Sequence, residues 1–241
     1  MISCEIVIGS TRALVITDNH EYVEICREEI IKQRNDLTEH IRKNPVFFYS
    51  LESVDCKRKD PEIVRMMSRA SYFAGVGPMA SVAGAISQLA LERMTEAGSS
   101  HVVINNGGDI CMKPGKNVTV GLFAGEGKRQ NDLCVRVPKN RAVSICSSSS
   151  KMGHSLSFGN CDLATVIGKR GEICDAMATA VANRIKTEDD IEPELNASVK
   201  RKGIYKVIAS INGKMGFAGK SFDFAICKDA ELAKKIVGYA K

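Results

Sequence analysis

The sequence contains no tryptophan, and aromatic residues make up only 5% of its 241 residues. Nucleic-acid binders commonly combine a basic face with aromatic side chains on which bases stack. The net charge is +6, but the excess is scattered in short groups such as Lys57–Lys59 and Lys200–Lys202. The composition therefore argues against nucleic acid as a partner.

No Cys-x-x-Cys pair occurs among the nine cysteines, which are spread over the whole chain. Their spacing indicates neither a zinc or iron–sulfur site nor a disulfide framework. No apolar run approaches the roughly 20 residues of a membrane span, and the start of the chain lacks the features of a signal peptide. We expect reduced thiols, no membrane contact and a cytoplasmic location.

Hydrophobic periodicity predicts three helices in the first half of the chain and mainly strands afterwards. The helices run from the N-cap Asn19 to Pro45, from the N-cap Asp60 to about Ala74, and from the small-residue stretch 75–84 to Gly98. Strands are expected at 3–8, 13–17, 101–104, 118–124, 132–137, 142–146, 163–167 and in a hairpin from 205, with one further helix at 174–185. This order predicts an α+β fold.

The first candidate site is the segment Asn106, Gly107, Gly108 and Asp109, which follows a predicted buried strand. A glycine turn leaves backbone amides free, and the carboxylate is suited to a hydroxyl, a cation or a proton. The alternative is a tight turn with a solvated aspartate.

The second candidate site is a serine-rich segment that contains one of only four histidines. Hydroxyls, backbone amides and an ammonium group can together hold a phosphate, and histidine transfers protons near neutral pH. The alternative is a surface loop. The candidate ligand-binding residues are Ser148, Ser149, Ser150, Lys151, Ser155 and Asp162, with His154 as the candidate proton-transfer group.

The third candidate is the pair Asp175 and Thr179, four residues apart at a predicted helix start. Their oxygens lie on one helix face and suit Mg²⁺ or Ca²⁺. The alternative is a surface Asp that caps the helix beside a Thr that faces the core. The small-residue stretch 75–84 is either an anion site at a helix N-terminus or a place of close helix packing.

The order of these motifs resembles the ApbE-like superfamily, whose known enzymes are FAD:protein FMN transferases. The likeness covers about residues 75–186, and Arg34–Leu37, Asn44–Phe47 and Val76–Gly84 resemble its compact cytoplasmic branch, which has no assigned function. The resemblance implies one domain over residues 1–241 with a T-fold-like antiparallel sheet packed with helices. It also implies Mg²⁺ at Asp175 and Thr179, a flavin nucleotide at residues 107–109, and a family histidine near His154.

Two departures argue against FMN transfer. Ala83 stands where the transferases have a lysine, and the residues after His154 lack their Asp-Pro. A lost cation removes a charge-assisted contact to pyrophosphate worth about 1.5–3 kcal/mol.

Three functions remain open from the sequence. The chain is a metal-assisted phosphoryl or nucleotidyl transferase in which His154 or Asp109 moves a proton, a non-catalytic binder of a flavin-like or phosphorylated metabolite, or a sulfur-handling protein. In the last case Cys146, Cys161 or Cys174 forms a reactive thiolate, and a helix N-terminus lowers the thiol pKa of Cys174. We expect the segments around Asp109, Ser148 and Asp175 to meet in one pocket, and the oligomeric state stays open, a homo-oligomer included.

Overall fold

The computed structural model describes residues 1–122, 133–149 and 159–226. Within these residues an eight-stranded antiparallel sheet has the strand order β1-β2-β3-β4-β7-β8-β9-β10, and a three-stranded antiparallel sheet has the order β11-β6-β5. The expected α+β class with an antiparallel sheet and packed helices is confirmed.

The helices are α1 (His20–Lys43), α2 (Val46–Tyr49), α3 (Glu62–Ala74), α4 (Val82–Glu96), α5 (Gly171–Arg184) and α6 (Ile191–Val199), with 3₁₀ turns η1 (Pro78–Ser81) and η2 (Glu188–Asp190). The strands are β1 (Ile2–Ile8), β2 (Thr11–Thr17), β3 (Val102–Asn106), β4 (Asp109–Lys113), β5 (Val118–Gly121), β6 (Leu133–Val137), β7 (Val143–Ser148), β8 (Leu163–Gly168), β9 (Ile204–Ile211), β10 (Lys214–Ala218) and β11 (Phe224–Ile226).

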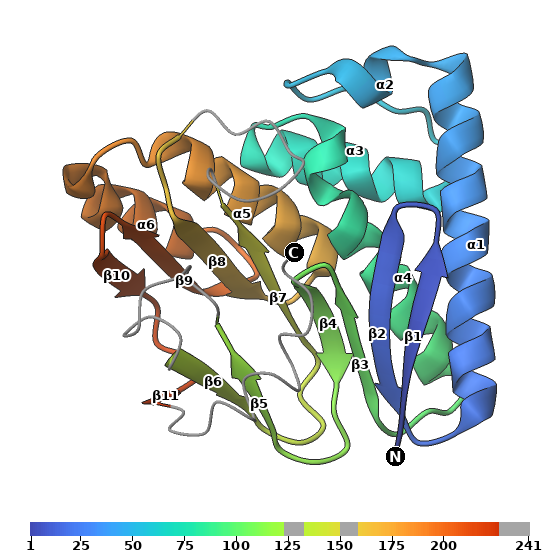
Figure 1. Cartoon of the computed structure of the whole chain (residues 1–241). Coiled ribbons are helices and arrows are strands. Elements are labelled where there is room, and N and C mark those ends of the chain that lie inside the picture. The colour runs from blue at the N-terminus through green and yellow to red at the C-terminus, as the bar shows by residue number, and fades with distance from the viewer. Residues whose placement is uncertain (123–132, 150–158, 227–241) are drawn as a thin grey trace.

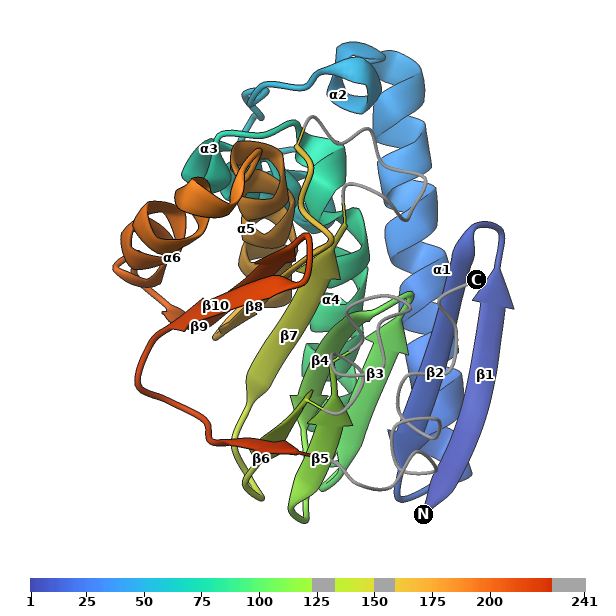
Figure 2. The same ribbon diagram turned by 60° about the vertical axis from the view of Figure 1, so that its left-hand side comes forward.

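The large sheet is covered on both faces at its centre. Helices cover one face, and the small sheet of β5, β6 and β11 covers part of the other (Figures 1 and 2). Neighbouring residues of β3 show the consequence, because Ile104 packs in the helix-side cluster while Val103 packs with residues of β5 and β6. Successive side chains of a strand point to opposite faces, so a strand covered on both sides is buried throughout.

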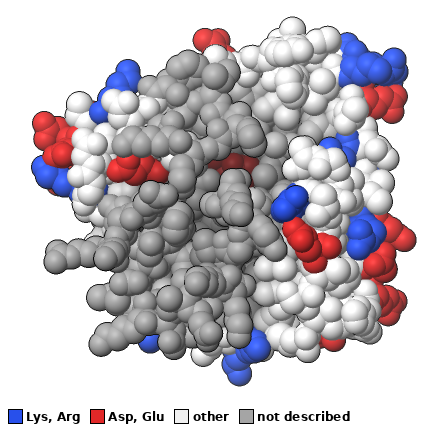
Figure 3. Space-filling model, viewed as in Figure 1, with Lys and Arg blue, Asp and Glu red and all other residues white. Residues whose placement is uncertain are grey.

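The long helix α1 forms as its periodicity predicts. Asn19 is the N-cap, and its side chain accepts a hydrogen bond from the backbone N–H of Glu21. One face carries the buried Val23, Cys26 and Ile30. On the surface shown in Figure 3, charges of both signs alternate along the right margin, where α1 lies, so this margin is not a basic patch.

Several local predictions are wrong. The N-cap of α3 is Pro61, whereas the Asp60 carboxylate accepts from the backbone N–H of Lys57. A short helix lies at Val46–Tyr49, where the sequence predicted no helix or strand, and the sequence did not indicate β4 or α6. Helix α5 begins at Gly171, three residues before the predicted start. The prediction was late because the apolar periodicity of this helix becomes clear only after its first turn.

In the described residues, no single helix has the length and hydropathy of a membrane span. Only the combination of α3 with the segment Pro78–Glu96 passes on length and composition, and it is bent by 101°.

Helices α4 and α5 lie against the sheet and touch each other at two glycines. A Cβ atom on Gly84 would overlap the carbonyl oxygen of Gly171 and lie 2.7 Å from the Cβ of Asp175. A Cβ atom on Gly171 would overlap the sulfur of Cys111 and the carbonyl oxygen of Gly84. The close-packing interpretation of the small-residue stretch is therefore correct at Gly84.

This contact predicts the sign of a stability change. In a helix without a neighbour, Gly→Ala raises stability by about 1 kcal/mol. Gly84→Ala should instead lower the free energy of unfolding by roughly 1–3 kcal/mol, because the new methyl group meets backbone that must move. Urea unfolding followed by circular dichroism measures the change, and a variant more stable than the wild type would contradict the contact.

Candidate functional site

The glycine turn between β3 and β4 places Asp109 at the start of β4. Asn106 and Asp109 pair across the hairpin, Gly107 and Gly108 have φ angles of 67° and 105°, and the side-chain oxygen of Asn105 accepts from the backbone N–H of Gly108 at 2.9 Å. Such angles favour glycine. A Cβ on either glycine would meet no described atom within 4 Å.

Asp109 itself is buried, with 8% of its surface exposed. One carboxylate oxygen accepts from the backbone N–H of Ser147 at 3.3 Å, at the end of the neighbouring strand β7. Burial raises the pKa of the Asp109 carboxyl to about 7, against the opposing effect of hydrogen bonds from Cys146 and Ser147. The solvated aspartate of the alternative interpretation is excluded by this burial.

Asp175 also lies in the interior, which excludes the surface Asp of the alternative interpretation. It is 8% exposed, and its Oδ2 accepts from the backbone N–H of Gly84 at 2.8 Å. Its pKa is raised well above the usual range, first by burial and then by the charge of Asp109. Asp109 and Asp175, which lie 66 residues apart in sequence, therefore form one buried acidic pair.

Other predicted residues lie around this pair. Asn106 donates from its side chain to the carbonyl oxygen of Ala83 at 3.4 Å, which connects the glycine turn to the start of α4. Ser148 ends β7 opposite Ala164 of β8, so Asp162, just before β8, lies at the same end of the sheet. Ser148, Ser149 and Asp162 are half-buried.

Thr179 is half-buried one helical turn after Asp175 on α5. Among the described residues, no group of three or more His, Cys, Asp or Glu side chains forms a metal-binding cluster. A cation at the pair would therefore need further oxygen ligands from Thr179, water or a bound phosphate.

Four predicted residues, Ser150, Lys151, His154 and Ser155, lie outside the described residues. The phosphate-binding and proton-transfer roles that the sequence suggested for them stay predictions.

The candidate thiols do not have the properties of reactive cysteines. Burial raises the pKa of the Cys146 and Cys174 thiols well above the usual range, so the predicted lowering at the start of α5 is wrong for Cys174. Buried Cys161 donates to the carbonyl oxygens of Leu163 and Ser210. Cys134 is disulfide-bonded, which departs from the expectation of reduced thiols throughout.

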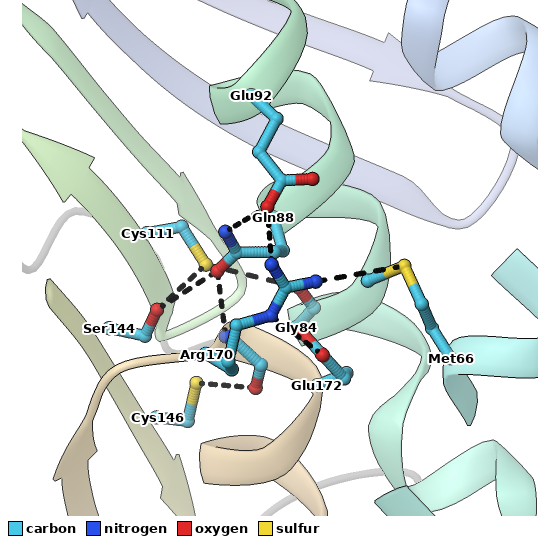
Figure 4. Close-up of polar contacts among 10 residues, drawn as sticks. Met66, Gly84, Gln88, Glu92, Cys111, Ser144, Cys146, Arg170 and Glu172 are labelled. Carbon is cyan, nitrogen blue, oxygen red and sulfur yellow. Dashed lines mark hydrogen bonds and ion pairs between the residues drawn. The ribbon is translucent and has the colours of Figure 1, made fainter. Parts of the chain in front are cut away.

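A polar network beside the pair was missed at the sequence level. Gln88 and Glu92 of α4 meet Arg170 and Glu172 at the start of α5 (Figure 4). Gln88 is 6% exposed within a run of apolar helical residues. A polar residue on a buried helix face was the available signal, because such a group needs hydrogen-bond partners.

The raised pKa of Asp109 makes stability depend on pH. The unfolded carboxyl has a pKa of about 3.9, so the protonated form is favoured by folding. Its stabilising contribution is complete below about pH 4 and is lost as pH rises through about 7. In urea unfolding with chelator, Asp109→Asn should therefore exceed the wild type in unfolding free energy at pH 8 by roughly 1–3 kcal/mol, but not at pH 4.

The control for this experiment is Asp36→Asn, which alters an aspartate in a surface ion pair with Lys32. Asp36→Asn should keep the wild-type dependence of stability on pH. Parallel pH profiles for the wild type and Asp109→Asn would show that Asp109 is ionised at no cost in the folded protein.

Comparison with known proteins identifies relatives and a shared fold. The chain is 38% identical over 221 residues to a UPF0280 protein of Methanocaldococcus jannaschii, covering 89% of each chain. It is 39% identical over 220 residues to a UPF0280 protein of Methanothermobacter thermautotrophicus, covering 88% of this chain and 84% of the relative.

Solved structures with a similar fold include a flavinyl transferase and an ApbE protein. The apo flavinyl transferase ApbE of Pseudomonas stutzeri matches with a TM-score of 0.59 at 13% identity, covering 100% of this chain and 97% of that chain. The ApbE protein of Thermotoga maritima matches with a TM-score of 0.54 at 10% identity, covering 94% and 97%. Residues 4–202 match the family described as AbpE bacteria, and the chain belongs to this ApbE-like family.

Proposed function

We propose that this chain binds a divalent cation at Asp109 and Asp175 together with a flavin- or nucleotide-like ligand that carries phosphate. The observation that carries the proposal is the buried acidic pair. The charge of Asp109 raises the pKa of Asp175, and ionising two buried carboxylates in one interior site is costly without a compensating charge. Among the described residues, no lysine or arginine contributes to the pKa shift of either carboxyl.

The donor set of the pair suits a hard cation. Mg²⁺ takes oxygen ligands, commonly one or two carboxylates plus water and substrate phosphate. Asp109 and Asp175 would hold the ion, with Thr179 on the same helix face as a third oxygen. When bound, the cation would offset the carboxylate charges and attract phosphate oxygens.

The ligand class follows from what surrounds the pair. No described atom would lie within 4 Å of a Cβ atom on Gly107 or Gly108, and Ser148, Ser149 and Asp162 lie at the same end of the sheet. Backbone amides and hydroxyls of this kind bind phosphate or sugar groups. The fold shared with flavin transferases adds support for a flavin nucleotide by analogy.

A transfer reaction is the second candidate. A carboxyl whose pKa is about 7, as at Asp109, has the property of a general acid or base near neutral pH. A bound cation keeps the same carboxylate ionised, so the two roles compete, and the pairing with Asp175 favours cation binding. FMN transfer is not part of the proposal, because Ala83 offers no cation at the start of α4.

No observation supports the sulfur-handling alternative, because burial raises the pKa of the Cys146 and Cys174 thiols, and Cys161 is buried and hydrogen-bonded to two backbone carbonyls. A cytoplasmic location is part of the proposal; seven described cysteines are free thiols, which supports it, whereas the disulfide at Cys134 does not.

Calorimetry tests the proposal. FAD, FMN and pyrophosphate are each titrated into the chain with Mg²⁺ or with EDTA. We expect at least one of them to bind about tenfold or more tightly with Mg²⁺, because ion and phosphate each stabilise the binding of the other. Asp175→Asn should abolish this difference, since the amide still accepts from the N–H of Gly84 but carries no charge.

Asp190→Asn is the matched control, because Asp190 is also a helix-capping aspartate but lies in the exposed capping box of η2. It should keep the Mg²⁺ dependence. Affinities unchanged by EDTA and by Asp175→Asn would show that Asp175 is only a helix cap.

A further inference from the structure

Helices α4 and α5 both begin without a side-chain cap from their own sequence. Ser81 precedes α4 and Arg170 precedes α5, and neither side chain accepts from the first turn of its helix. The first backbone N–H groups of a helix have no partner within the helix and need acceptors from elsewhere when they are buried.

Each helix supplies the missing cap of the other. The Asp175 carboxylate of α5 accepts from the backbone N–H of Gly84, in the first turn of α4. The side-chain oxygen of Gln88, one turn further along α4, accepts at 2.9 Å from the backbone N–H of Gly171, the first residue of α5. The two caps are thus reciprocal.

The spacing of the two caps fixes one helix relative to the other. Gly84 and Gln88 are four residues apart on α4, and Gly171 and Asp175 are four residues apart on α5. Residues at this spacing share a helix face. Because Gln88 pairs with Gly171 while Gly84 pairs with Asp175, the two faces run in opposite directions, and a shift along either helix breaks both bonds.

The Gln88 amide is held in one orientation. Its oxygen also accepts from the hydroxyl of Ser144 at 3.4 Å, and its nitrogen donates to Glu92 at 2.9 Å. Glu92 in turn accepts from Arg170, whose Nε donates to Glu172 at 2.9 Å (Figure 4). An amide with partners on both ends is ordered, and here the order is shared by α4, β7 and the start of α5.

We propose that Gln88 is a positioning residue for the acidic pair, which sets the place of the Asp175 carboxylate through the backbone of Gly171. The part of this inference that concerns cation binding rests on the proposed function. The hydrogen-bond partners of the Gln88 side chain are Gly171, Ser144 and Glu92 rather than either carboxylate, so Gln88 acts through the start of α5. Neighbours of metal ligands typically change metal affinity about 10–100-fold when they are altered.

The test compares Gln88→Met with two controls in the full chain. Gln88→Met keeps the length of the side chain but loses the acceptor for Gly171 and the donor to Glu92. Glu92→Gln keeps an acceptor for both Gln88 and Arg170. Ile86→Val removes one methylene from a buried residue of α4 that packs in the helix-side cluster, and serves as a variant that only lowers stability.

Mn²⁺ alone is the metal probe, and electron paramagnetic resonance measures both its affinity and the line shape of the bound ion. We expect Gln88→Met to weaken Mn²⁺ binding about tenfold or more and to change the line shape. Glu92→Gln and Ile86→Val should bind Mn²⁺ with an affinity within about threefold of the wild type and should keep the wild-type line shape. If Gln88→Met binds Mn²⁺ with the same affinity and line shape as Ile86→Val, the inference is overturned.

A second readout needs no metal. The titration of the Asp175 carboxyl, followed by carbon NMR, should move in Gln88→Met and stay in place in both controls. The groups that share its surroundings are Asp109 and Cys111 of β4, Cys146 of β7, and Cys174 of α5. These residues are unchanged in Gln88→Met and in both controls, so a shift in the pKa of the Asp175 carboxyl reports a change in its position.

The two readouts separate the claims. Absence of Mn²⁺ binding in the wild type with a shifted Asp175 titration in Gln88→Met would refute cation binding and support positioning. An unchanged titration would refute positioning whatever the metal result. Should Gln88→Met not fold, Ser144→Ala removes the hydroxyl that donates to the Gln88 oxygen and to the sulfur of Cys111, and a smaller shift in the same direction is expected.

Discussion

The contact between α4 and α5 at Gly84 and Gly171 determines where the Asp175 carboxylate lies. A side chain at either glycine would overlap the backbone of the opposite helix, so the helices approach as closely as their main chains allow. At this distance Asp175 reaches the first turn of α4 and comes within electrostatic range of Asp109 on the sheet. The candidate site therefore depends on a backbone contact that carries no chemistry of its own.

The acidic pair also has a cost for the folded chain. Burial raises the pKa of both carboxyls, and Asp109 titrates near neutral pH, so ionising the pair at pH 7 works against folding. Hydrogen bonds from Gly84 and Ser147 offset only part of that cost. Proteins tolerate such groups where function requires them. A cation that binds between the carboxylates would offset their charges, so the repulsion that opposes folding would favour cation binding.

Sequence reasoning located the acidic residues but not their surroundings. The motifs around Asp109 and Asp175 were visible because glycines and a four-residue spacing are local patterns. Their burial was not, because Asp175 is covered by a helix about 90 residues earlier in the chain. The same long-range packing raises the thiol pKa of Cys174, where the local rule predicted a decrease. Gln88 was missed because its role exists only across two helices, and β4 was missed because a two-glycine turn resembles the start of a loop.

The most direct test of the central claim is anomalous diffraction from crystals grown with Mn²⁺ and FAD. If the acidic pair holds the cation, one strong anomalous peak should lie between Asp109 and Asp175, within coordination distance of both carboxylates, with phosphate density beside it. Bound FAD with the manganese peak elsewhere, or with no peak at the pair, would show that Asp109 and Asp175 do not hold the cation.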